Sequence, residues 1–204
     1  MRVYFDTGIF IDYLSTRGGA NALLRSSERR GRSPADIATD AERLFENVGR
    51  DRAGATSCLT YYEVEEALYR LLTQSAKGIS RADTLLIPAA RSITTQVRIV
   101  VELFSISVLD LTSETVSLQL RQLDLQTRGI RAADALHAAT AIAFGADLLV
   151  SADEALLNLD GILVNNQGRK IRCVDTDLAL QLWKTAARPP LRGLPRRSPL
   201  QIAV

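Results

Sequence analysis

The chain has 204 residues, of which 47% are hydrophobic and 24% charged, and its formal net charge is +2. This length fits one domain with additions rather than two separate domains, since a typical domain has about 100 to 200 residues, and the composition is that of a globular chain. Such a small net charge does not by itself identify a nucleic-acid binder, and the sequence holds no apolar run of the roughly 18 to 20 residues that a membrane span needs.

The N-terminal residues predict a strand, a loop and a helix. Residues 1–5 are apolar and β-prone, Asp6-Thr7-Gly8 interrupts the run, and residues 9–14 resume it as helical turns. Asp6 therefore follows directly after the first strand. No basic region with an apolar stretch and a cleavage site precedes the strand, so we expect no secretory route and a cytoplasmic location.

A long polar segment, about residues 15–52, follows. Its first part, 15–32, is rich in Gly, Ser and Arg and is expected to be a mobile loop. Ser33-Pro34 then supplies an N-cap and a first-turn proline for an amphipathic helix that ends near Val48. Because its arginines suit phosphate contacts, the segment is expected to form an interface or to guide RNA.

The second strand and its helix are predicted from residues 53–72. Residues 53–59 are small and β-compatible, and a helix is expected from Tyr61 to about Leu72. Thr60 with Glu63 three residues later has the spacing of a capping box. Glu63 is thereby placed in the first turn of this helix.

The middle of the chain predicts further helices around one strand. Ser80 is expected to cap one or two helices that extend to about Phe104, with a kink or an early proline at Pro88. Residues 106–111 alternate like a strand. Thr112 or Ser113 then caps a helix that runs to about residue 127, before Gly129.

The densest pattern lies between residues 131 and 153. The run from Arg131 to Phe144 is alanine-rich and helical, Gly145 ends it, residues 146–150 form a buried strand, and Ser151-Ala152-Asp153 follows. Asp134 falls in the first turn of the helix. A last strand at 170–174 and a last helix at 177–184 complete the pattern.

Alternating strands and helices predict an α/β fold with a central, mainly parallel sheet and helices on both faces, because parallel strands need crossover connections. We expect one domain over residues 1–180 and a basic tail rich in Pro and Arg over 181–204. The tail is either a solvated terminus or an arm that contacts phosphates. Its basic residues are Lys184, Arg188, Arg192, Arg196 and Arg197.

Four acids are expected to meet although they are far apart in sequence. Ligands of open α/β sheets collect beyond the carboxyl ends of the strands, and Asp6, Glu63, Asp134 and Asp153 all lie in turns at that edge. Gathered carboxylates repel one another unless a cation compensates them. Mg²⁺ or Mn²⁺ with a substrate phosphate suits such ligands. The site would then hydrolyse a phosphodiester with water as the nucleophile.

Four sequence blocks resemble the PIN domain family, in the family's usual order, over most of residues 1–175. They are VYFDTGIFIDYL, TSCLTYYEVEEAL, RAADALHAATAIAFGADLLVSADEALL and the final KIRCVD. The resemblance implies a three-layer sandwich in which the four acids bind metal and small hydroxyl residues, here Thr7 and Ser151, lie beside the first and last of them.

The resemblance also implies an activity, endoribonucleolytic cleavage of RNA. Small family members are often toxins of toxin-antitoxin pairs, which implies a cognate antitoxin and a homodimer. The long segment at 15–52 and the C-terminal extension leave a larger RNA-processing nuclease open. A PIN-like module that binds RNA or protein without cleaving is the alternative from another functional class.

Other residues carry weaker expectations. Arg131 is a candidate phosphate contact beside Asp134, and Glu154 is a candidate to share or replace the role of Asp153. His137, the one histidine of the chain, is expected to be packed or to cap a helix rather than to act as a base. Asp12 and Glu66 are expected on solvated faces or in support of the site, whereas Cys58 and Cys173 are expected to be buried free thiols.

Overall fold

The strands of the protein form one parallel sheet. The computed structural model describes residues 1–25, 27–78 and 82–186. Over these residues the sheet has five strands in the order β3-β2-β1-β4-β5, and every neighbouring pair is parallel. The strands are β1 (Val3–Phe5), β2 (Gly54–Ser57), β3 (Ser107–Leu109), β4 (Leu148–Val150) and β5 (Arg172–Val174). The predicted α/β class is confirmed.

The central strand β1 is buried on both faces. Val3 pairs with Gly54 of β2 on one side and with Leu148 of β4 on the other. Val3 and Phe5 belong to one hydrophobic core and Tyr4 to a second, because successive side chains of a strand point to opposite faces. A parallel sheet with helices on both faces requires this double burial.

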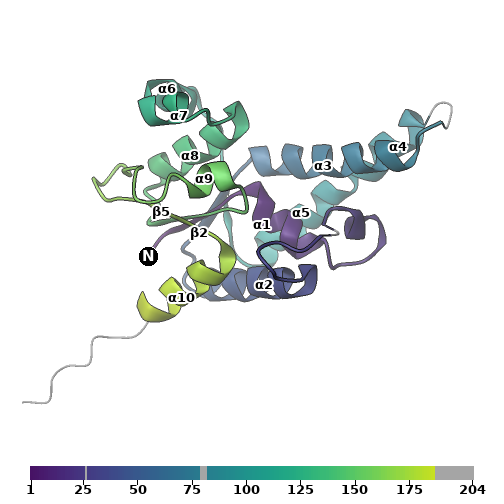
Figure 1. Cartoon of the computed structure of the whole chain (residues 1–204), viewed down its shortest axis with the longest axis horizontal. Coiled ribbons are helices and arrows are strands. Elements are labelled where there is room, and N and C mark those ends of the chain that lie inside the picture. Colours follow the sequence, from purple (N-terminus) through teal and green to yellow (C-terminus); the bar gives the residue numbers. More distant parts are fainter. Residues whose placement is uncertain (26, 79–81, 187–204) are drawn as a thin grey trace, which may run out of the picture.

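Helices cover both faces of the sheet, which gives three layers (Figure 1). The helices of the Val3/Phe5 core are α1 (Thr7–Leu14), α2 (Pro34–Arg50), α3 (Leu59–Ser75), α5 (Ile93–Leu103) and α10 (Thr176–Ala186). Those of the Tyr4 core are α6 (Ser113–Arg121), α7 (Leu123–Thr127), α8 (Ala132–Phe144) and α9 (Glu154–Leu157). The end of α3 projects from the body together with α4 (Asp83–Arg91). The predicted sandwich is therefore confirmed.

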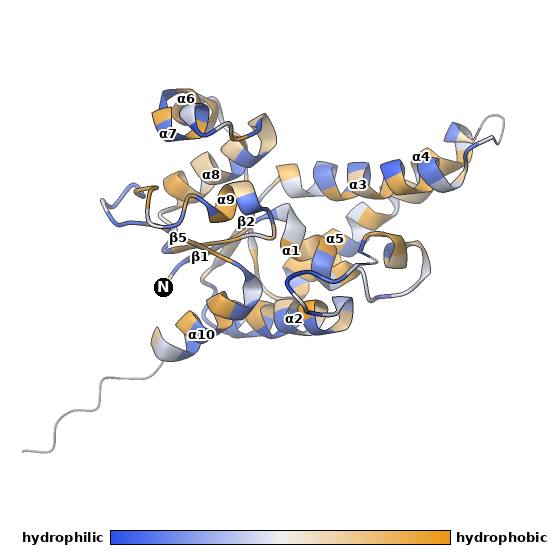
Figure 2. Ribbon diagram, in the orientation of Figure 1, coloured by the Kyte–Doolittle hydropathy of each residue, from blue (hydrophilic) through white to orange (hydrophobic). Residues whose placement is uncertain are grey.

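Helix α2 forms as its sequence predicts. The Ser33 hydroxyl accepts a hydrogen bond from the Asp36 amide at 3.2 Å, and Pro34 occupies the first turn. Ile37, Leu44 and other apolar residues of α2 are fully buried. Figure 2 shows the matching alternation of apolar and polar colour along this helix. Amphipathic periodicity thus fixes which face of α2 meets the sheet.

The predicted capping box at the start of α3 is wrong. The helix begins at Leu59, after Cys58, which makes no side-chain cap. The Ser57 hydroxyl instead accepts a hydrogen bond from the Leu59 amide at 3.2 Å. The Thr60 hydroxyl lies 2.8 Å from that of Thr56, inside the protein. The helix therefore starts two residues earlier than predicted, and Thr60 is a buried residue of its first turn.

The helices before β3 agree with the expectation of one or two, whereas the helix after β3 is more divided than expected. Two helices, α4 and α5, precede β3, and Pro88 lies inside α4, while the predicted cap Ser80 lies outside the described residues. Thr112 caps α6 by accepting from the Thr115 amide, as predicted. Gln122, with ψ of 96°, separates α6 from α7, so the predicted single helix is two.

The segment after α1 is attached to the body of the protein. It contains a short 3-10 helix, η1 (Gly19–Leu23), and its Arg25 and Arg29 form ion pairs with Asp12 of α1. Asp12 is fully buried, so its expected place on a solvated face is wrong. Glu66 is partly exposed and accepts a hydrogen bond from Arg70 one helical turn later, at 2.9 Å.

The C-terminal helix α10 continues to Ala186. Trp183 of this helix is buried in the same core as α2, so residues 181–186, which were assigned to the tail, are helical. The rest of the predicted tail, 187–204, lies outside the described residues. No helix in the described part of the chain is both long enough and apolar enough to cross a membrane.

Gly49 gives a stability prediction. A Cβ atom at this position would lie 2.2 Å from the Phe104 carbonyl oxygen, a backbone atom that cannot move without displacing the core. We expect Gly49→Ala to lower the free energy of unfolding by about 1 to 3 kcal/mol, the usual cost of overpacking. Urea unfolding measures the effect, with the exposed Arg43→Ala of the same helix as control. Equal stability of Gly49→Ala and the unmutated protein would contradict the close approach.

Candidate active site

A cleft of about 430 Å³ opens beyond the carboxyl ends of β1 and β4. The chain leaves β1 toward β2 on one side and returns to β4 on the other, so the cleft lies at the switch point where α/β sheets bind ligands. The residues that line it are Asp6, Thr7, Gly8, Ile11, Arg25, Glu63, Arg70, Asp134, Ala152 and Asp153. The structure thus brings all four predicted acids to one cleft.

Ser151 joins the first acid to the last. Asp6 is 6% exposed, and its Oδ2 accepts a hydrogen bond from the Ser151 hydroxyl at 2.8 Å. The same hydroxyl accepts from the Asp153 amide at 3.0 Å. Asp153 also caps α9 by accepting from the Ala155 amide at 2.7 Å. Asp153 Oδ1 is therefore held by the helix cap, and the residue also lines the cleft.

Gly8 allows the two turns of the cleft to approach each other. A Cβ atom at Gly8 would lie 3.1 Å from the Cβ of Ala152 and 3.5 Å from Asp6 Oδ2. A side chain here would push the start of α1 away from the turn after β4. The sequence shows this residue only as part of a loop, so its packing role was not predicted.

Glu63 is fixed by two polar side chains. The Thr7 hydroxyl donates a short hydrogen bond to Glu63 Oε2, and His137 Nε2 lies 2.7 Å from the same oxygen. Burial raises the pKa of Glu63, but the hydrogen bond and the charge of His137, together with the Thr7 bond, outweigh it and lower the pKa. The carboxyl of Glu63 is therefore held in its ionised form.

His137 is packed in the core, as predicted, but its contact with a site acid was missed. The ring is fully buried, and its Nδ1 lies 2.8 Å from the Tyr4 hydroxyl. Burial lowers the pKa of His137, whereas the hydrogen bond to Glu63 and the charges of Asp6, Glu63 and Asp134 raise it above its usual value. An ionised carboxylate only accepts hydrogen bonds, so Nε2 keeps its hydrogen and donates a hydrogen bond to Glu63.

Asp134 lies in the first turn of α8, as predicted. Burial and the nearby charges of Asp153, Asp6 and Glu63 raise the pKa of Asp134 to about 6. Among the residues that the structure describes, no lysine or arginine forms an ion pair with any of the four acids. Among the described residues, His137 is thus the one basic side chain in direct contact with these acids.

Two weaker candidates lie away from the cleft. Arg131 is exposed at the start of α8 and is not among the residues that line the cleft. The Glu154 side chain is 83% exposed and lies 3.8 Å from Arg30, so the cleft geometry favours Asp153 over Glu154.

Both cysteines are free, but only Cys173 is buried, and the expected burial of Cys58 is wrong.

A comparison with known families supports the likeness of the sequence blocks. A family model described as the PIN domain matches residues 3–162. The chain belongs to the PIN domain family. Neither the curated proteins nor the solved structures that were compared gave a match. Membership implies a nuclease-type function, and PIN domains typically depend on a divalent metal ion.

The donor set of this PIN domain fits a hard divalent cation. Potential ligand atoms of Asp6, Glu63 and His137 lie within 4.8 Å of one another, and the carboxyls of Asp134 and Asp153 line the same cleft. The His137 nitrogen is already hydrogen-bonded to Glu63, which leaves carboxylate oxygens as the available donors. Oxygen ligands with uncompensated negative charge suit Mg²⁺ or Mn²⁺.

The raised pKa of Asp134 gives a stability prediction for the metal-free protein. The folded-state pKa, about 6, exceeds the usual value for Asp, so the folded state binds the proton more tightly than the unfolded chain does. The stability this contributes is complete at acidic pH and is lost as the pH rises through about 6. Above that pH, Asp134→Asn is expected to raise the free energy of unfolding by about 1 to 2 kcal/mol.

Thermal unfolding at neutral pH with a chelator measures this difference. If Asp134 belongs to the ligand set, as the sequence predicts, adding Mn²⁺ should reverse the order, because the unmutated protein then gains more stability by binding the ion. A lower melting temperature for Asp134→Asn in chelator would contradict the repulsion among the acids.

Proposed function

We propose that this PIN domain is a metal-dependent endoribonuclease that hydrolyses RNA phosphodiester bonds, with Asp6, Glu63, Asp134 and Asp153 as ligands of Mg²⁺ or Mn²⁺. The observation that carries the proposal is the meeting of four acids from distant segments in one cleft, without lysine or arginine partners among the described residues. Family membership supports a nuclease of RNA.

The residues around the acids support this role by fixing their orientation. Ser151 holds Asp6 and the turn that carries Asp153, while Thr7 and His137 hold Glu63. Partners of this kind set the direction of the ligand oxygens before a cation binds. When bound, the cation supplies Lewis-acid chemistry, which makes water more acidic and stabilises negative charge on the phosphate.

Water is the proposed nucleophile because the hydroxyls at the site have other partners. The Thr7 hydroxyl donates to Glu63 and the Ser151 hydroxyl donates to Asp6. Both oxygens are thus committed to orienting carboxylates. The carboxylates beside these hydroxyls are proposed ligands. His137 Nε2, which lies 3.1 Å from the Thr7 hydroxyl, donates to Glu63, so neither kind of group is free to act as the base that a hydroxyl nucleophile needs.

Cleavage of a labelled single-stranded RNA tests the proposal. We expect products with Mn²⁺ or Mg²⁺ and none with a chelator, and we expect a DNA of the same sequence to be cleaved much less. Attack by water leaves a phosphomonoester end, whereas attack by the RNA 2′-hydroxyl leaves a cyclic phosphate, so analysis of the product ends distinguishes the two. RNA that is bound but left intact under all metal conditions would favour the non-catalytic binding module instead.

We further propose that the protein acts in the cytoplasm as a homodimer and as the toxin of a toxin-antitoxin pair. The resemblance of its blocks to the PIN family, whose small members are often toxins, supports this role. A small protein encoded in the neighbouring reading frame should then bind the chain and block the acidic cleft. If the neighbouring frames encode no such protein, the RNA-processing role is favoured.

A further inference from the structure

Two arginines line the acidic cleft without pairing with its acids. Arg25 and Arg70 contribute to the same cleft as the four acids. Arg25 forms its ion pair with Asp12, and Arg70 pairs with Glu66 on its own helix at 2.9 Å. Opposite charges thus lie around one cleft without neutralising each other. The positions of the two arginines are therefore set by contacts outside the group of four acids.

For Arg25 the cause is a buried charge network behind the cleft. Asp12 is fully buried, and its Oδ1 contacts Arg25 Nε. Arg29 Nη1 donates to Asp12 Oδ1 at 3.1 Å, and Arg29 Nη2 lies 2.8 Å from Asp12 Oδ2. Arg29 Nη2 also donates to Asp175 Oδ1 at 2.9 Å. Two acids and two guanidinium groups therefore hold the segment between α1 and α2 against the sheet edge.

This network fixes the orientation of the Arg25 side chain. Its Nε atom is buried against Asp12, while 21% of the side chain is exposed and the residue lines the cleft. Among the described residues Asp12 is the one ion-pair partner of Arg25. Because Arg25 pairs with Asp12, it does not form ion pairs with the four acids of the cleft, where it would compete with a cation.

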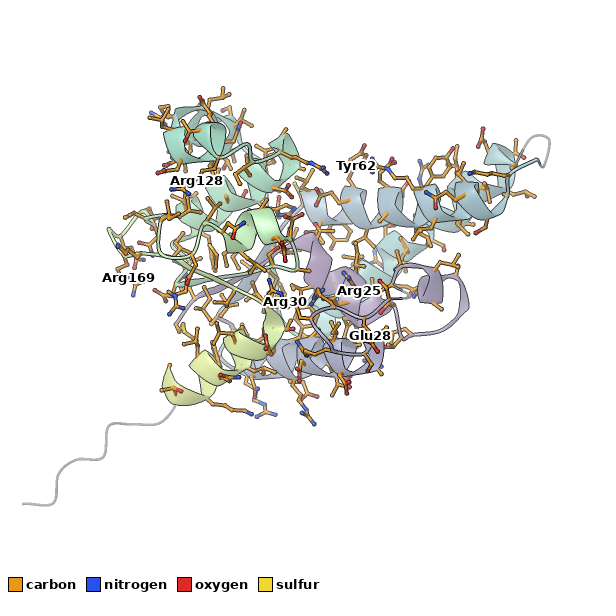
Figure 3. The ribbon with its side chains drawn as sticks, viewed as in Figure 1. Arg25, Glu28, Arg30, Tyr62, Arg128 and Arg169 are labelled. Carbon is orange, nitrogen blue, oxygen red and sulfur yellow. The ribbon has the colours of Figure 1, made fainter. Side chains whose placement is uncertain are left out.

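The position of Arg25 in the molecule fits this role. Figure 3 shows Arg25 and Arg30 on the segment between α1 and α2, near the middle of the molecule, whereas Arg169 lies at its edge. A guanidinium has several donors in a plane and matches the oxygens of a phosphate. The wall of the cleft formed by this segment therefore offers an anion contact beside the proposed cation site.

We propose that Arg25 binds a backbone phosphate of the RNA at the rim of the cleft, and that Asp12, Arg29 and Asp175 hold it there. The inference rests on the proposed function, because it assigns the contact for an RNA strand whose neighbouring phosphate lies over the four acids. The four acids attract the cation, and Arg25, held by Asp12, attracts the RNA strand.

RNA binding by Arg25→Gln tests this assignment. The probe is a short fluorescein-labelled single-stranded RNA, with Ca²⁺, which takes the same oxygen ligands, in place of Mn²⁺. We expect binding about 10-fold weaker and a salt dependence that falls by about one phosphate contact. Arg169→Gln, which removes a half-exposed arginine that pairs with Asp147, serves as matched control and should bind RNA like the unmutated protein.

Mn²⁺ binding separates a phosphate contact from a supporting role. Calorimetric titration should give the same Mn²⁺ affinity for Arg25→Gln and the unmutated protein, which also shows that the cleft has folded. Unchanged RNA affinity and salt dependence in Arg25→Gln would overturn the proposal. Lost Mn²⁺ binding would overturn it too, because Arg25 would then maintain the cleft rather than hold RNA.

A conservative variant and a modified RNA sharpen the test. Arg25→Lys keeps a charge for Asp12 but lacks further nitrogens, so it should bind RNA as weakly as Arg25→Gln, and full recovery would overturn the role of the guanidinium. Neutral methylphosphonates placed one at a time should reveal one position that weakens binding of the unmutated protein but not of Arg25→Gln. Absence of cleavage by the unmutated protein refutes the nuclease, whereas these binding measurements still decide the role of Arg25.

Discussion

Asp6→Asn is expected to lower the rate of Mn²⁺-dependent RNA cleavage by about 10²- to 10³-fold or more, the usual loss when a principal electrostatic group of an active site is removed. Asp6 follows the central strand β1, is 6% exposed and lies at the switch point of the sheet. An amide keeps the size of the side chain and an acceptor for the Ser151 hydroxyl but removes the negative charge. Its effect should therefore fall on the cation and not on the fold.

The measurement is the initial rate of cleavage of a labelled RNA across a series of Mn²⁺ concentrations. Asp124→Asn is the matched control, because Asp124 is an exposed acid of α7 whose partner is Arg128, 3.7 Å away. The control should keep the full rate. If Asp6→Asn and Asp124→Asn cleave equally well, Asp6 is not a ligand and the proposed metal site is wrong.

Asp12→Ala is expected to lower the free energy of unfolding by about 3 to 5 kcal/mol, the usual cost of leaving buried charge without its partner. Asp12 is fully buried between Arg25 and Arg29. Burial raises the pKa of Asp12, and the hydrogen bond and charges of the two arginines oppose that rise. Without the carboxylate, Arg29 keeps only Asp175 and Arg25 has no ion-pair partner among the described residues.

Urea unfolding measures the loss, with Glu42→Ala as control. Glu42 also pairs with an arginine of the same segment, Arg17, but both side chains are about two-fifths exposed, and exposed pairs contribute about 0 to 1 kcal/mol. A loss for Asp12→Ala no larger than for Glu42→Ala would mean that the arginines reach water when the acid is removed. The buried network would then not fix the segment.

The four acids could be predicted because their meeting follows from topology. Parallel strands end at one edge of a sheet, so an acid directly after a strand, such as Asp6 or Asp153, lies there whatever the details of packing. Asp134 required only the start of α8, which the change from Gly129 and Ile130 to an alanine-rich run marks. These inferences depended on strand ends and helix starts, which local sequence determines.

The resemblance placed Thr7 and Ser151 beside the acids, but the contacts of Asp12 could not be predicted because its partners are distant in sequence. Asp12 lies in a helix whose neighbours Phe10, Tyr13 and Leu14 are all buried, which left no solvated face for it. Its partner Arg29 also bonds to Asp175, 146 residues later. Periodicity along one helix does not show which segment covers it, so the expectation of a solvated Asp12 failed.

The capping-box prediction failed because one spacing serves two purposes. Thr60 and Glu63 have the separation of a helix cap, yet the Thr60 hydroxyl lies close to those of Thr56 and Thr7, and Glu63 is bound by Thr7 and His137. Glu63 is turned to the cleft and Thr60 to the buried side of it, instead of to the helix end. A local pattern is therefore unreliable where its residues also belong to a functional site.

The order of the strands has a consequence during synthesis of the chain. β1 is made before its neighbour β4, which leads into the turn with Asp153. The roughly 140 residues between these two strands must be translated before β4 can leave the ribosome. Until then Asp6 has no Ser151 to orient it. If the four acids act as proposed, an incomplete chain cannot attack the messenger from which it is being translated.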